Sequence, residues 1–294
     1  VDMPEFPEWC VDIRKRYTAI APCKVLLADD QDDFRAKIAE ADAVVVEDLV
    51  VGEAELAAAP NLKIVQNFRT DMRNIDEAAC AARGIPALPF HRQVNVAVGE
   101  HAFALMMSLA KKLCETNKLL TIEALQAEGW PARVYNRKHT ANSNWARING
   151  VKNIFGSTLG IVGLGSVGRY VANWANAFGM KVIYTQRNQL DAALEAEFKA
   201  TYVSLNELFE QSDFVSIHVP LNDSTKGLIG AEQLNRATRK PVIVNIARAD
   251  IIQRDALLAA LDAGTLGGVG MDVHYKEPGD ADDPFLKYKN VIMS

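Results

Sequence analysis

The chain has 294 residues, of which 49% are hydrophobic and 23% are charged. At roughly 150 residues per domain this length predicts about two domains, which excludes a small disulfide scaffold or an isolated peptide-binding module. The composition is that of an ordinary globular protein and excludes wholesale disorder or a collagen-like chain. The 37 acidic and 32 basic residues leave a net charge of -5 without a dense Lys/Arg stripe, so nucleic acid is not expected as a partner.

Cysteine usage and the length of the apolar stretches indicate a cytoplasmic chain. The four cysteines are far apart and form neither a CxxC pair nor the Cys/His spacing of a metal site, so we expect reduced thiols and no metal. The most apolar stretch, residues 102–110, is well short of the roughly 20 residues that cross a bilayer, so no membrane partner is expected. The sequence opens at Val1 rather than Met, which leaves a removed targeting peptide open.

The first third of the chain has the pattern of an α/β domain. Between about residues 24 and 89, short β-branched runs alternate with helical segments, which predicts βαβ units around a parallel sheet. We take residues 1–97 as this first domain. The expected strands are KVLLA, DAVVVE and LKIVQ. Three helices are expected: one from Asp32, a short one from Gly52, and one over residues 75–83.

A long amphipathic helix is expected next, over residues 98–116, because apolar side chains recur there at three- and four-residue spacing. Residues 129–156 follow as a polar stretch of weak periodicity, which is long for a loop in a compact domain and indicates a functional role or contact with a partner. Arg133, His139 and Arg147 in this loop could reach a substrate, or the loop could be a solvated or subunit-bridging arm.

A second alternating series runs from this loop to the last residue. The apolar runs DFVSIHV and PVIVNIA are nearly continuous, as expected of strands that helices cover on both faces. This pattern predicts a doubly wound parallel sheet, and residues 98–294 form the second domain. The expected strands are TLGIVG, KVIYT, DFVSIHV, PVIVNIA, GGVGMDV and NVIM, and the expected helices are residues 166–178, 190–198, a short one near 231, and 253–263.

A glycine motif opens the second series. Gly163, Gly165 and Gly168 form a GxGxxG pattern directly after a predicted strand and at the start of a predicted helix. In this context the first glycine makes a tight turn, the second lets the backbone approach a pyrophosphate, and the third lets helix and strand pack closely. Backbone N–H groups at the helix N-terminus then meet the anion. The motif therefore predicts a Rossmann dinucleotide-binding domain.

The end of the next strand bears on the choice of dinucleotide. A carboxylate normally stands there to accept hydrogen bonds from the adenosine ribose hydroxyls. Here the strand ends in Gln186 and Arg187, and the first carboxylate is Asp191. The permanently charged, planar guanidinium of Arg187 suits a 2'-phosphate, which favours NADP. A solvent-facing arginine without a ligand is the alternative.

Polar groups also follow the later strands, where the ligand crevice of an open α/β sheet lies. His218, Val219 and Pro220 come after DFVSI, and Asp272 comes after GGVGM. Arg248 follows PVIVNIA and can bind a carboxylate next to a carbonyl by two parallel hydrogen bonds. A structural salt bridge is the alternative role for this arginine.

Together these segments carry a family resemblance. The stretch from residue 157 to 183, with HVPLNDSTKGLI, VNIARADIIQRDALLAALDAGTLGG and MDVHYKEP, resembles the D-isomer-specific 2-hydroxyacid dehydrogenases. The run at residues 73–113 is similar to that family's substrate domain and linking helix. The resemblance covers about residue 24 to the end. It implies two doubly wound parallel-sheet domains, a flavodoxin-like substrate domain at residues 1–97 and a Rossmann cofactor domain.

The resemblance also implies roles for individual residues. Arg248 would bind the 2-keto acid, and Glu277 would be the acid paired with the catalytic histidine. The loop at residues 68–73 would offer backbone N–H groups to the substrate carboxylate, although Arg69 and Asp71 depart from the family's Gly-rich form. The implied cofactor residues are Ser166 and Val167 at the pyrophosphate, Gln186 and Arg187 at the adenosine ribose, Val219, Pro220 and Thr225 at the nucleotide half, and Ile246, Ala247 and Asp272 at the nicotinamide.

The family's general acid/base histidine has no counterpart in this sequence. The resemblance implies it two residues beyond the strand NVIMS, and the sequence stops at Ser294. Of the five histidines, His218 stands where the family has a packing residue and His274 lies in the loop leading to Glu277. The other three, His91, His101 and His139, are taken to lie outside the cofactor domain. We expect a truncated chain whose catalytic histidine lies beyond Ser294.

The resulting hypothesis is an oxidoreductase that transfers a hydride between NAD(P) and a small 2-hydroxy or 2-keto acid. A 2-keto acid reductase of the glyoxylate/hydroxypyruvate type is favoured, with NADP preferred over NAD, acting as a cytoplasmic homodimer. A formate or phosphite dehydrogenase on the same scaffold is one alternative. The other is a non-enzymatic, corepressor-like dinucleotide sensor. Arg248 and Glu277 together favour an enzyme over a sensor.

Overall fold

The computed structural model describes residues 12, 15–16, 23–68, 72–90, 92–129 and 148–294. Contacts within the chain divide it into two compact units, Val1–Gln93 and Val94–Ser294. Each unit contains a parallel sheet with helices, which confirms the α/β fold class. None of the helices in the described part of the chain combines the length and apolarity needed to cross a membrane.

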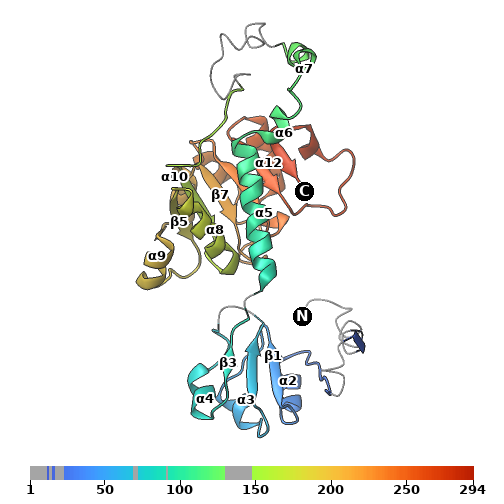
Figure 1. Cartoon of the computed structure of the whole chain (residues 1–294), viewed down its shortest axis with the longest axis vertical. Coiled ribbons are helices and arrows are strands. Elements are labelled where there is room, and N and C mark those ends of the chain that lie inside the picture. The colour runs from blue at the N-terminus through green and yellow to red at the C-terminus, as the bar shows by residue number, and fades with distance from the viewer. Residues whose placement is uncertain (1–11, 13–14, 17–22, 69–71, 91, 130–147) are drawn as a thin grey trace. The chain divides into compact units, whose positions relative to one another are not determined.

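The first unit contains a three-stranded sheet (Figure 1). Its strands are all parallel and follow each other in chain order, and right-handed crossovers then place the connecting helices on one face. Asp30 and Asp76 cap two of the helices by accepting hydrogen bonds from backbone N–H groups. The elements are α2 (Gln31–Ile38), β1 (Ala43–Val46), α3 (Glu53–Ala57), β2 (Ile64–Asn67), α4 (Glu77–Ala82) and β3 (Ala87–Leu88).

One predicted strand of this unit is wrong. Residues 24–28, the run KVLLA, have no strand assignment, although their composition is typical of a strand. Val25 and Leu26 are 45% and 38% exposed, respectively. A strand requires hydrogen bonds to a neighbouring strand, and this run pairs with no other strand in the described residues. Its β-branched composition alone therefore does not produce a strand.

The second unit contains a seven-stranded parallel sheet in the order β10-β9-β8-β7-β4-β5-β6. The chain starts at β4, moves outward through β5 and β6, and returns to the other side at β7, so the order reverses between β4 and β7. This reversal makes the sheet doubly wound, with its ligand crevice at the carboxyl ends of the strands around the switch point. The strands are β4 (Thr158–Val162), β5 (Lys181–Thr185), β6 (Ala200–Tyr202), β7 (Phe214–Ile217), β8 (Val242–Asn245), β9 (Gly268–Met271) and β10 (Val291–Met293).

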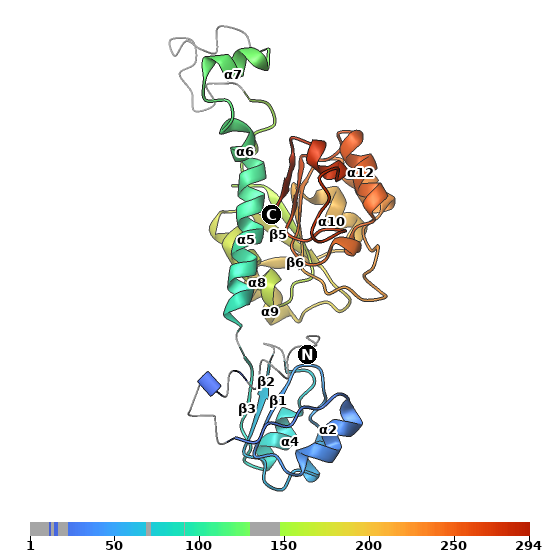
Figure 2. The same ribbon diagram turned by 90° about the vertical axis from the view of Figure 1, so that its right-hand side faces the viewer.

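Helices cover both faces of this sheet (Figures 1 and 2). On one face, α5 and α8 pack on strands β4, β5, β7 and β8 in a single apolar cluster. On the other face, α10, α11 and α12 form a second cluster with the same sheet. The helices of this unit are α5 (Gln93–Ala110), α6 (Leu113–Thr116), α7 (Ile122–Ala127), α8 (Ser166–Ala177), α9 (Ala192–Phe198), α10 (Leu205–Gln211), α11 (Ala231–Arg236) and α12 (Arg254–Asp262).

The linking helix differs from its predicted bounds. It begins at Gln93, earlier than expected, and the chain turns at Lys112, whose φ of 52° lies in the left-handed region. The predicted helix 98–116 is therefore two helices, α5 and α6, rather than one. Helix α7 lies in a segment where no helix was predicted. Most of the predicted long loop, including Arg133, His139 and Arg147, lies outside the described residues.

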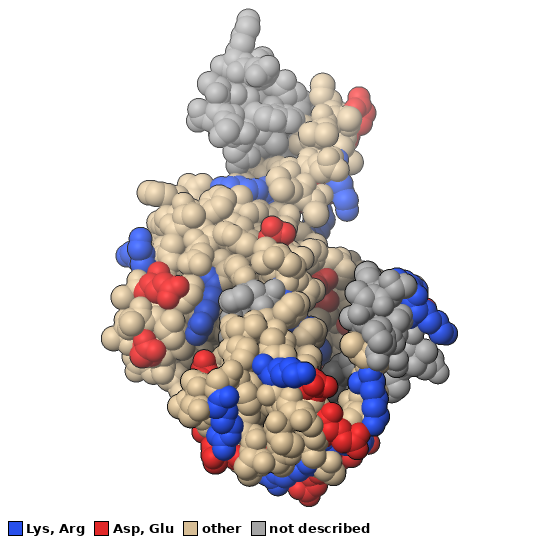
Figure 3. All heavy atoms as spheres, turned by 60° about the horizontal axis from the view of Figure 1, so that its bottom comes forward, with Lys and Arg blue, Asp and Glu red and all other residues tan. Residues whose placement is uncertain are grey.

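Acidic and basic side chains are interspersed on the face of the molecule that Figure 3 shows. In the first unit Arg83 pairs with Glu53 and Lys63 with Asp42. Among the described residues visible on this face, no extended area carries charge of one sign. Electrostatic binding of nucleic acid requires an extended positive area.

Candidate cofactor and active site

The carboxyl ends of six strands in the larger sheet form one row. The strand register fixes this row, because each terminal residue pairs with the terminal residue of its neighbour. The next residue of each strand therefore leaves the sheet at the same edge, so the structure brings the predicted strand-end residues of this unit together. In sheet order, the residues that follow the strands are Ser294, Asp272, Ile246, His218, Gly163 and Gln186.

Two of the three motif glycines are required by the protein's own packing. Gly163 has a φ of 97°, which favours glycine, and a Cβ built on it would lie 2.7 Å from Cγ1 of Val219. A Cβ on Gly168 would collide with the carbonyl oxygen of Gly163. These two glycines therefore allow the tight turn and the close approach of α8 to β4 that the sequence predicted.

Gly165 differs from the other two glycines, because no neighbouring protein atom excludes a side chain at this position. A Cβ built on it meets nothing within 4 Å. The residue is the N-cap of α8, and no side chain caps that helix terminus. The open space at Gly165 and the uncapped backbone N–H groups fit a pyrophosphate held at a helix N-terminus. The loop is thus suited to a dinucleotide on the evidence of its own packing.

Val219, Pro220 and Thr225 belong to one folded turn beside the glycine loop. The hydroxyl of Thr225 donates to the carbonyl of Pro220 at 2.6 Å and accepts from the backbone N–H of Asn222 at 2.8 Å. The contact between Val219 and Gly163 described above places this turn against the glycine loop. The threonine therefore shapes the loop that was predicted to meet the nucleotide half of the cofactor.

Gln186 connects the glycine loop to the end of β5. Its Oε1 accepts a hydrogen bond from the backbone N–H of Leu164 at 3.2 Å, and its Nε2 donates to the carbonyl of Asn188 at 2.7 Å. Arg187 is exposed and its side chain forms no hydrogen bond or ion pair with a described residue. Gln186 therefore fixes the loop, and the Arg187 guanidinium is available to a ligand.

Asn245 organises the end of β8, a role that sequence reasoning missed. Its side chain is buried, accepts from the backbone N–H of Ala247 at 3.0 Å and donates to the carbonyl of Arg248 at 2.9 Å. Its own carbonyl accepts from the backbone N–H of Asp272 at 3.1 Å. One buried amide thus shapes the segment from Ile246 to Arg248, and its backbone connects that segment to β9.

The Arg248 guanidinium has no acidic partner among the described residues. Its one hydrogen bond there is from Nη1 to the carbonyl of Ala247, at 2.7 Å, and the residue is exposed. The alternative role of a structural salt bridge is therefore not seen in this part of the chain. A guanidinium oriented by its own backbone and lacking a counter-ion is suited to a carboxylate ligand.

Glu277 and Asp272 lie on the segment after β9, with two histidines nearby. Oε1 of Glu277 accepts from the backbone N–H of His274 at 2.8 Å, and Nε2 of His274 lies 3.0 Å from the carbonyl of Ser294. Asp272 was expected at the nicotinamide, and its Oδ1 lies 3.5 Å from Nε2 of His101 on α5. The assignment of His101 outside the cofactor domain is therefore wrong, because α5 packs on this sheet although it is far from β9 in the chain.

His218 is not a proton donor at neutral pH. Its Nε2 lies 2.8 Å from Oγ of the buried Ser216, and its Nδ1 is enclosed with no hydrogen-bond partner in the described structure. Burial lowers the pKa of His218 to about 3, so the imidazole stays neutral at pH 7. This agrees with the packing position assigned to it from sequence.

The first unit has its own cluster at the carboxyl ends of its strands. Phe68 follows β2 and Phe90 lies just after β3, and their rings stack at 5.2 Å between centroids. The Arg92 guanidinium lies 4.9 Å from the centre of the Phe68 ring, and its Nη1 is 3.5 Å from Oε1 of Glu47. Sequence reasoning did not single out this cluster. Arg69 and Asp71 of the predicted carboxylate-binding loop lie outside the described residues.

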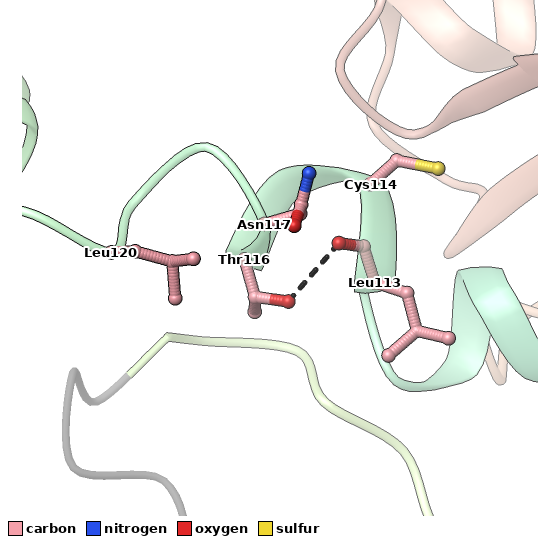
Figure 4. Close-up of a pocket in the computed structure, with 5 residues that line it drawn as sticks. All are labelled: Leu113, Cys114, Thr116, Asn117 and Leu120. Atoms are coloured by element: carbon pink, nitrogen blue, oxygen red, sulfur yellow. Dashed lines mark hydrogen bonds between the residues drawn. The ribbon is translucent and has the colours of Figure 1, made fainter.

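A hollow in the larger unit lies away from this edge of the sheet. It has a volume of about 460 Å³ and lies along α6 and the segment after it (Figure 4). Thr116 donates its hydroxyl hydrogen to the carbonyl of Leu113 within this hollow. Its described lining contains no charged side chain, so it offers no cation to a phosphate or a carboxylate. It is lined by Leu113, Cys114, Thr116, Asn117 and Leu120.

Comparisons with known proteins settle the family. The model of the D-isomer specific 2-hydroxyacid dehydrogenase NAD-binding domain matches residues 103–294. The chain belongs to the D-isomer-specific 2-hydroxyacid dehydrogenases. It is therefore an oxidoreductase that depends on a nicotinamide dinucleotide, and the predicted enzyme class and Rossmann domain are confirmed.

Several relatives are similar over most of the chain. A glyoxylate reductase of Korarchaeum cryptofilum is 34% identical over 237 residues, which cover 81% of this chain and 67% of that protein. A glyoxylate/hydroxypyruvate reductase B of Yersinia pestis is 29% identical and covers 91% and 77%, respectively. Both relatives are reductases by name.

Solved structures agree on the fold. A glyoxylate reductase from Paecilomyes thermophila superposes with a TM-score of 0.58 at 28% identity, covering 95% of this chain and 83% of that chain. A formate dehydrogenase from Granulicella M. superposes with a TM-score of 0.57 at 26% identity and covers 89% of this chain. This chain spans 66% of the length of that formate dehydrogenase.

Proposed function

We propose that this protein is a 2-keto acid reductase of the glyoxylate/hydroxypyruvate type that uses NADPH. The observation that carries the proposal is Arg248. Its guanidinium leaves the carboxyl end of β8 with no acidic partner among the described residues, and the segment before it is fixed by the buried Asn245. A cation held in this way can bind the carboxylate of a keto acid, and its charge can stabilise the negative charge that develops on the carbonyl oxygen.

The cofactor residues are those at the carboxyl edge of the larger sheet. When bound, the nicotinamide supplies hydride chemistry that no side chain provides. The pyrophosphate is assigned to the glycine loop, because Gly165 leaves open space in front of an uncapped helix N-terminus. The proposed set is Gly163, Gly165, Ser166, Val167, Gly168, Gln186, Arg187, Val219, Pro220, Thr225, Ile246, Ala247 and Asp272.

The preference for NADPH over NADH rests on the end of β5. Gln186 uses its amide within the protein and offers no carboxylate to ribose hydroxyls. Arg187 is exposed and lacks an acidic partner among the described residues. A 2'-phosphate carries roughly two negative charges, so a cation without a counter-ion favours it over a hydroxyl.

Glu277 is proposed to act through a histidine rather than on the substrate. A carboxylate next to an imidazole raises the imidazole pKa toward the working pH and orients the ring for proton transfer. His218 does not fill this role, since burial keeps it neutral. Arg248 and Glu277 are thus the proposed catalytic pair of the described residues.

The first unit is proposed to bind the substrate acid. Residues 1–97 form the substrate-binding domain and residues 98–294 the cofactor domain in this proposal, which also places the enzyme in the cytoplasm as a homodimer. The carboxyl edge of the smaller sheet carries the Phe68, Phe90 and Arg92 cluster. An aromatic surface beside a guanidinium suits a small organic acid.

A turnover screen of the full-length protein tests the proposal. We expect the protein to reduce glyoxylate or hydroxypyruvate with NADPH. The fall in absorbance of the reduced nicotinamide measures the rate. Formate or phosphite oxidation without keto acid reduction would instead support the alternative that the similarity to a formate dehydrogenase suggests. Tight dinucleotide binding with no turnover of any of these compounds would support the sensor.

A further inference from the structure

The loop between β5 and α9, residues 186–191, is anchored at its far end by side chains outside the proposed cofactor set. Tyr184 is fully buried on β5, and its hydroxyl accepts from the backbone N–H of Leu190 at 2.9 Å. The same hydroxyl donates to Oε1 of Glu195 on α9 at 2.8 Å. Nε2 of Gln189 donates to that carboxylate oxygen at 2.9 Å. The far end of the loop is therefore fixed to both flanking elements.

The near end of the loop is anchored as well. The carbonyl of Gln186 accepts from the hydroxyl of Tyr202 at 3.3 Å, and its side chain bridges the glycine loop as described above. The rings of Tyr184 and Tyr202 contact each other edge to face, with 5.5 Å between centroids. Two tyrosines from neighbouring strands thus hold the two ends of one loop.

Between these anchors, the side chains of Arg187 and Asn188 are exposed and form no hydrogen bond with a described residue. A guanidinium on a flexible loop loses conformational freedom when it binds a phosphate, which weakens binding. When a loop is fixed at both ends, its backbone has already lost conformational entropy during folding, so phosphate binding loses less. The position of Arg187 therefore depends on hydrogen bonds made by other residues.

We propose that Tyr184 and Glu195 form a positioning pair that holds Arg187 for the cofactor's 2'-phosphate and so determines the preference for NADPH. This inference rests on the proposed use of NADPH and names the residues behind that preference. Glu195 acts here as a hydrogen-bond acceptor for Tyr184 and Gln189. Neither Tyr184 nor Glu195 is expected to touch the cofactor.

The test measures cofactor binding rather than turnover. Tyr184→Phe removes the hydroxyl, leaves the Leu190 N–H without its acceptor and keeps the buried ring. We expect the Kd for NADPH, measured by quenching of protein fluorescence, to rise about 5- to 20-fold, with the Kd for NADH changing by less than about twofold. Adenosine 2',5'-bisphosphate lacks the nicotinamide half, and its Kd should rise by the same factor as the Kd for NADPH.

Matched variants separate positioning from general loosening. Tyr275→Phe removes another tyrosine hydroxyl of the same unit, one that donates to the carbonyl of Ile252 at 2.9 Å, and should leave the ratio of the two Kd values unchanged. Glu195→Ala should reproduce the effect of Tyr184→Phe, and the double variant should be no weaker than either single one, because both changes break the same contact. Glu195→Gln keeps an acceptor oxygen and should retain the preference.

Each outcome decides the inference. If Tyr184→Phe weakens NADPH and NADH equally, or weakens neither, the positioning role is overturned. If Glu195→Gln by itself strengthens NADPH binding, the carboxylate acts through its charge, which also overturns the role. A different result contradicts the proposed use of NADPH. In that case the wild-type protein shows no preference for NADPH, and Arg187→Ala changes neither Kd. If Tyr184→Phe does not fold, Glu195→Ala carries the test, since its side chain is only partly buried.

Discussion

Lowering the pH from 6.5 toward 3 should destabilise the larger unit through a single partly buried histidine. His218 lies at the end of β7, and the ring is held by Oγ of Ser216 at 2.8 Å from Nε2. Its Nδ1 is enclosed by the fold with no hydrogen-bond partner in the described structure. A proton added to this ring would place a charge beside an enclosed nitrogen that has no described partner, which the folded state resists.

The magnitude follows from the two pKa values. Histidine in an unfolded chain has a pKa near 6.5, and burial lowers the pKa of His218 to about 3. Between these pH values the unfolded chain binds a proton that the folded chain does not, so the free energy of unfolding decreases as the pH falls. At roughly 1.36 kcal/mol per pH unit, the loss is about 2 kcal/mol at pH 5. Above pH 6.5 the group contributes nothing.

Urea unfolding at pH 7 and pH 5 measures this loss, with His218→Gln as the matched variant. The glutamine amide can still bond to Ser216 but does not titrate. The wild-type protein should lose about 2 kcal/mol more than the variant between the two pH values. Surface carboxylates with a lowered pKa, such as Glu53 beside Arg83, titrate below this window and are common to both proteins. Equal losses in the two proteins would refute the assignment of a buried neutral imidazole.

Four further predictions concern the site. Arg248→Ala should lower kcat/KM for 2-keto acids by about 30-fold or more, which is equivalent to about 2 kcal/mol. The dinucleotide Kd, measured by fluorescence titration, should stay within a few-fold of wild type. Near-normal turnover would show that Arg248 does not bind the substrate. Gly165→Ala should keep the wild-type Tm but bind dinucleotide about tenfold more weakly. Gly168→Ala should lower the Tm, because its Cβ meets the carbonyl of Gly163. The reverse pattern would contradict the assignment of Gly165 to the ligand and of Gly168 to internal packing. Arg187→Ala should raise the Kd for NADPH by about tenfold and leave NADH unchanged, and an equal effect on both would show that the 2'-phosphate lies elsewhere. Arg92→Gln should raise the KM for keto acids about threefold or more without changing the dinucleotide Kd, and an unchanged KM would make Arg92 a purely structural partner of Phe68.

Sequence alone predicted the elements whose signals are local. The run PVIVNIA predicts a buried strand, and β8 spans Val242–Asn245 with all four residues buried. The GxGxxG motif between a strand and a helix predicted a tight turn at the first glycine and close packing at the third. The structure shows a φ of 97° at Gly163 and close packing at Gly168. These features depend on backbone conformation and side-chain size within a few residues, so a short window of sequence contains them.

Sequence patterns were less informative where an element depends on a neighbour. Residues 24–28 have the composition of a strand but no pairing partner among the described residues, and they form no strand. Helix α5 ends at Ala110 because the chain turns at Lys112, whereas apolar spacing alone would continue the helix to residue 116. Periodicity indicates where a face can be buried, and the partner decides whether the element forms.

The arrangement of the site was decided by tertiary structure. Parallel pairing in one register brings Gly163, Ile246 and Asp272 to one edge, although they are far apart in the chain. Asn245 and Tyr184 appear in the sequence as ordinary strand residues, yet each orients a segment that carries a proposed ligand contact. Their partners lie on separate elements or across a turn, so these roles follow only once the sheet has formed. The sequence therefore determined which chemistry is present, and the fold determined which groups act together, because hydrogen bonds and burial depend on distance in space.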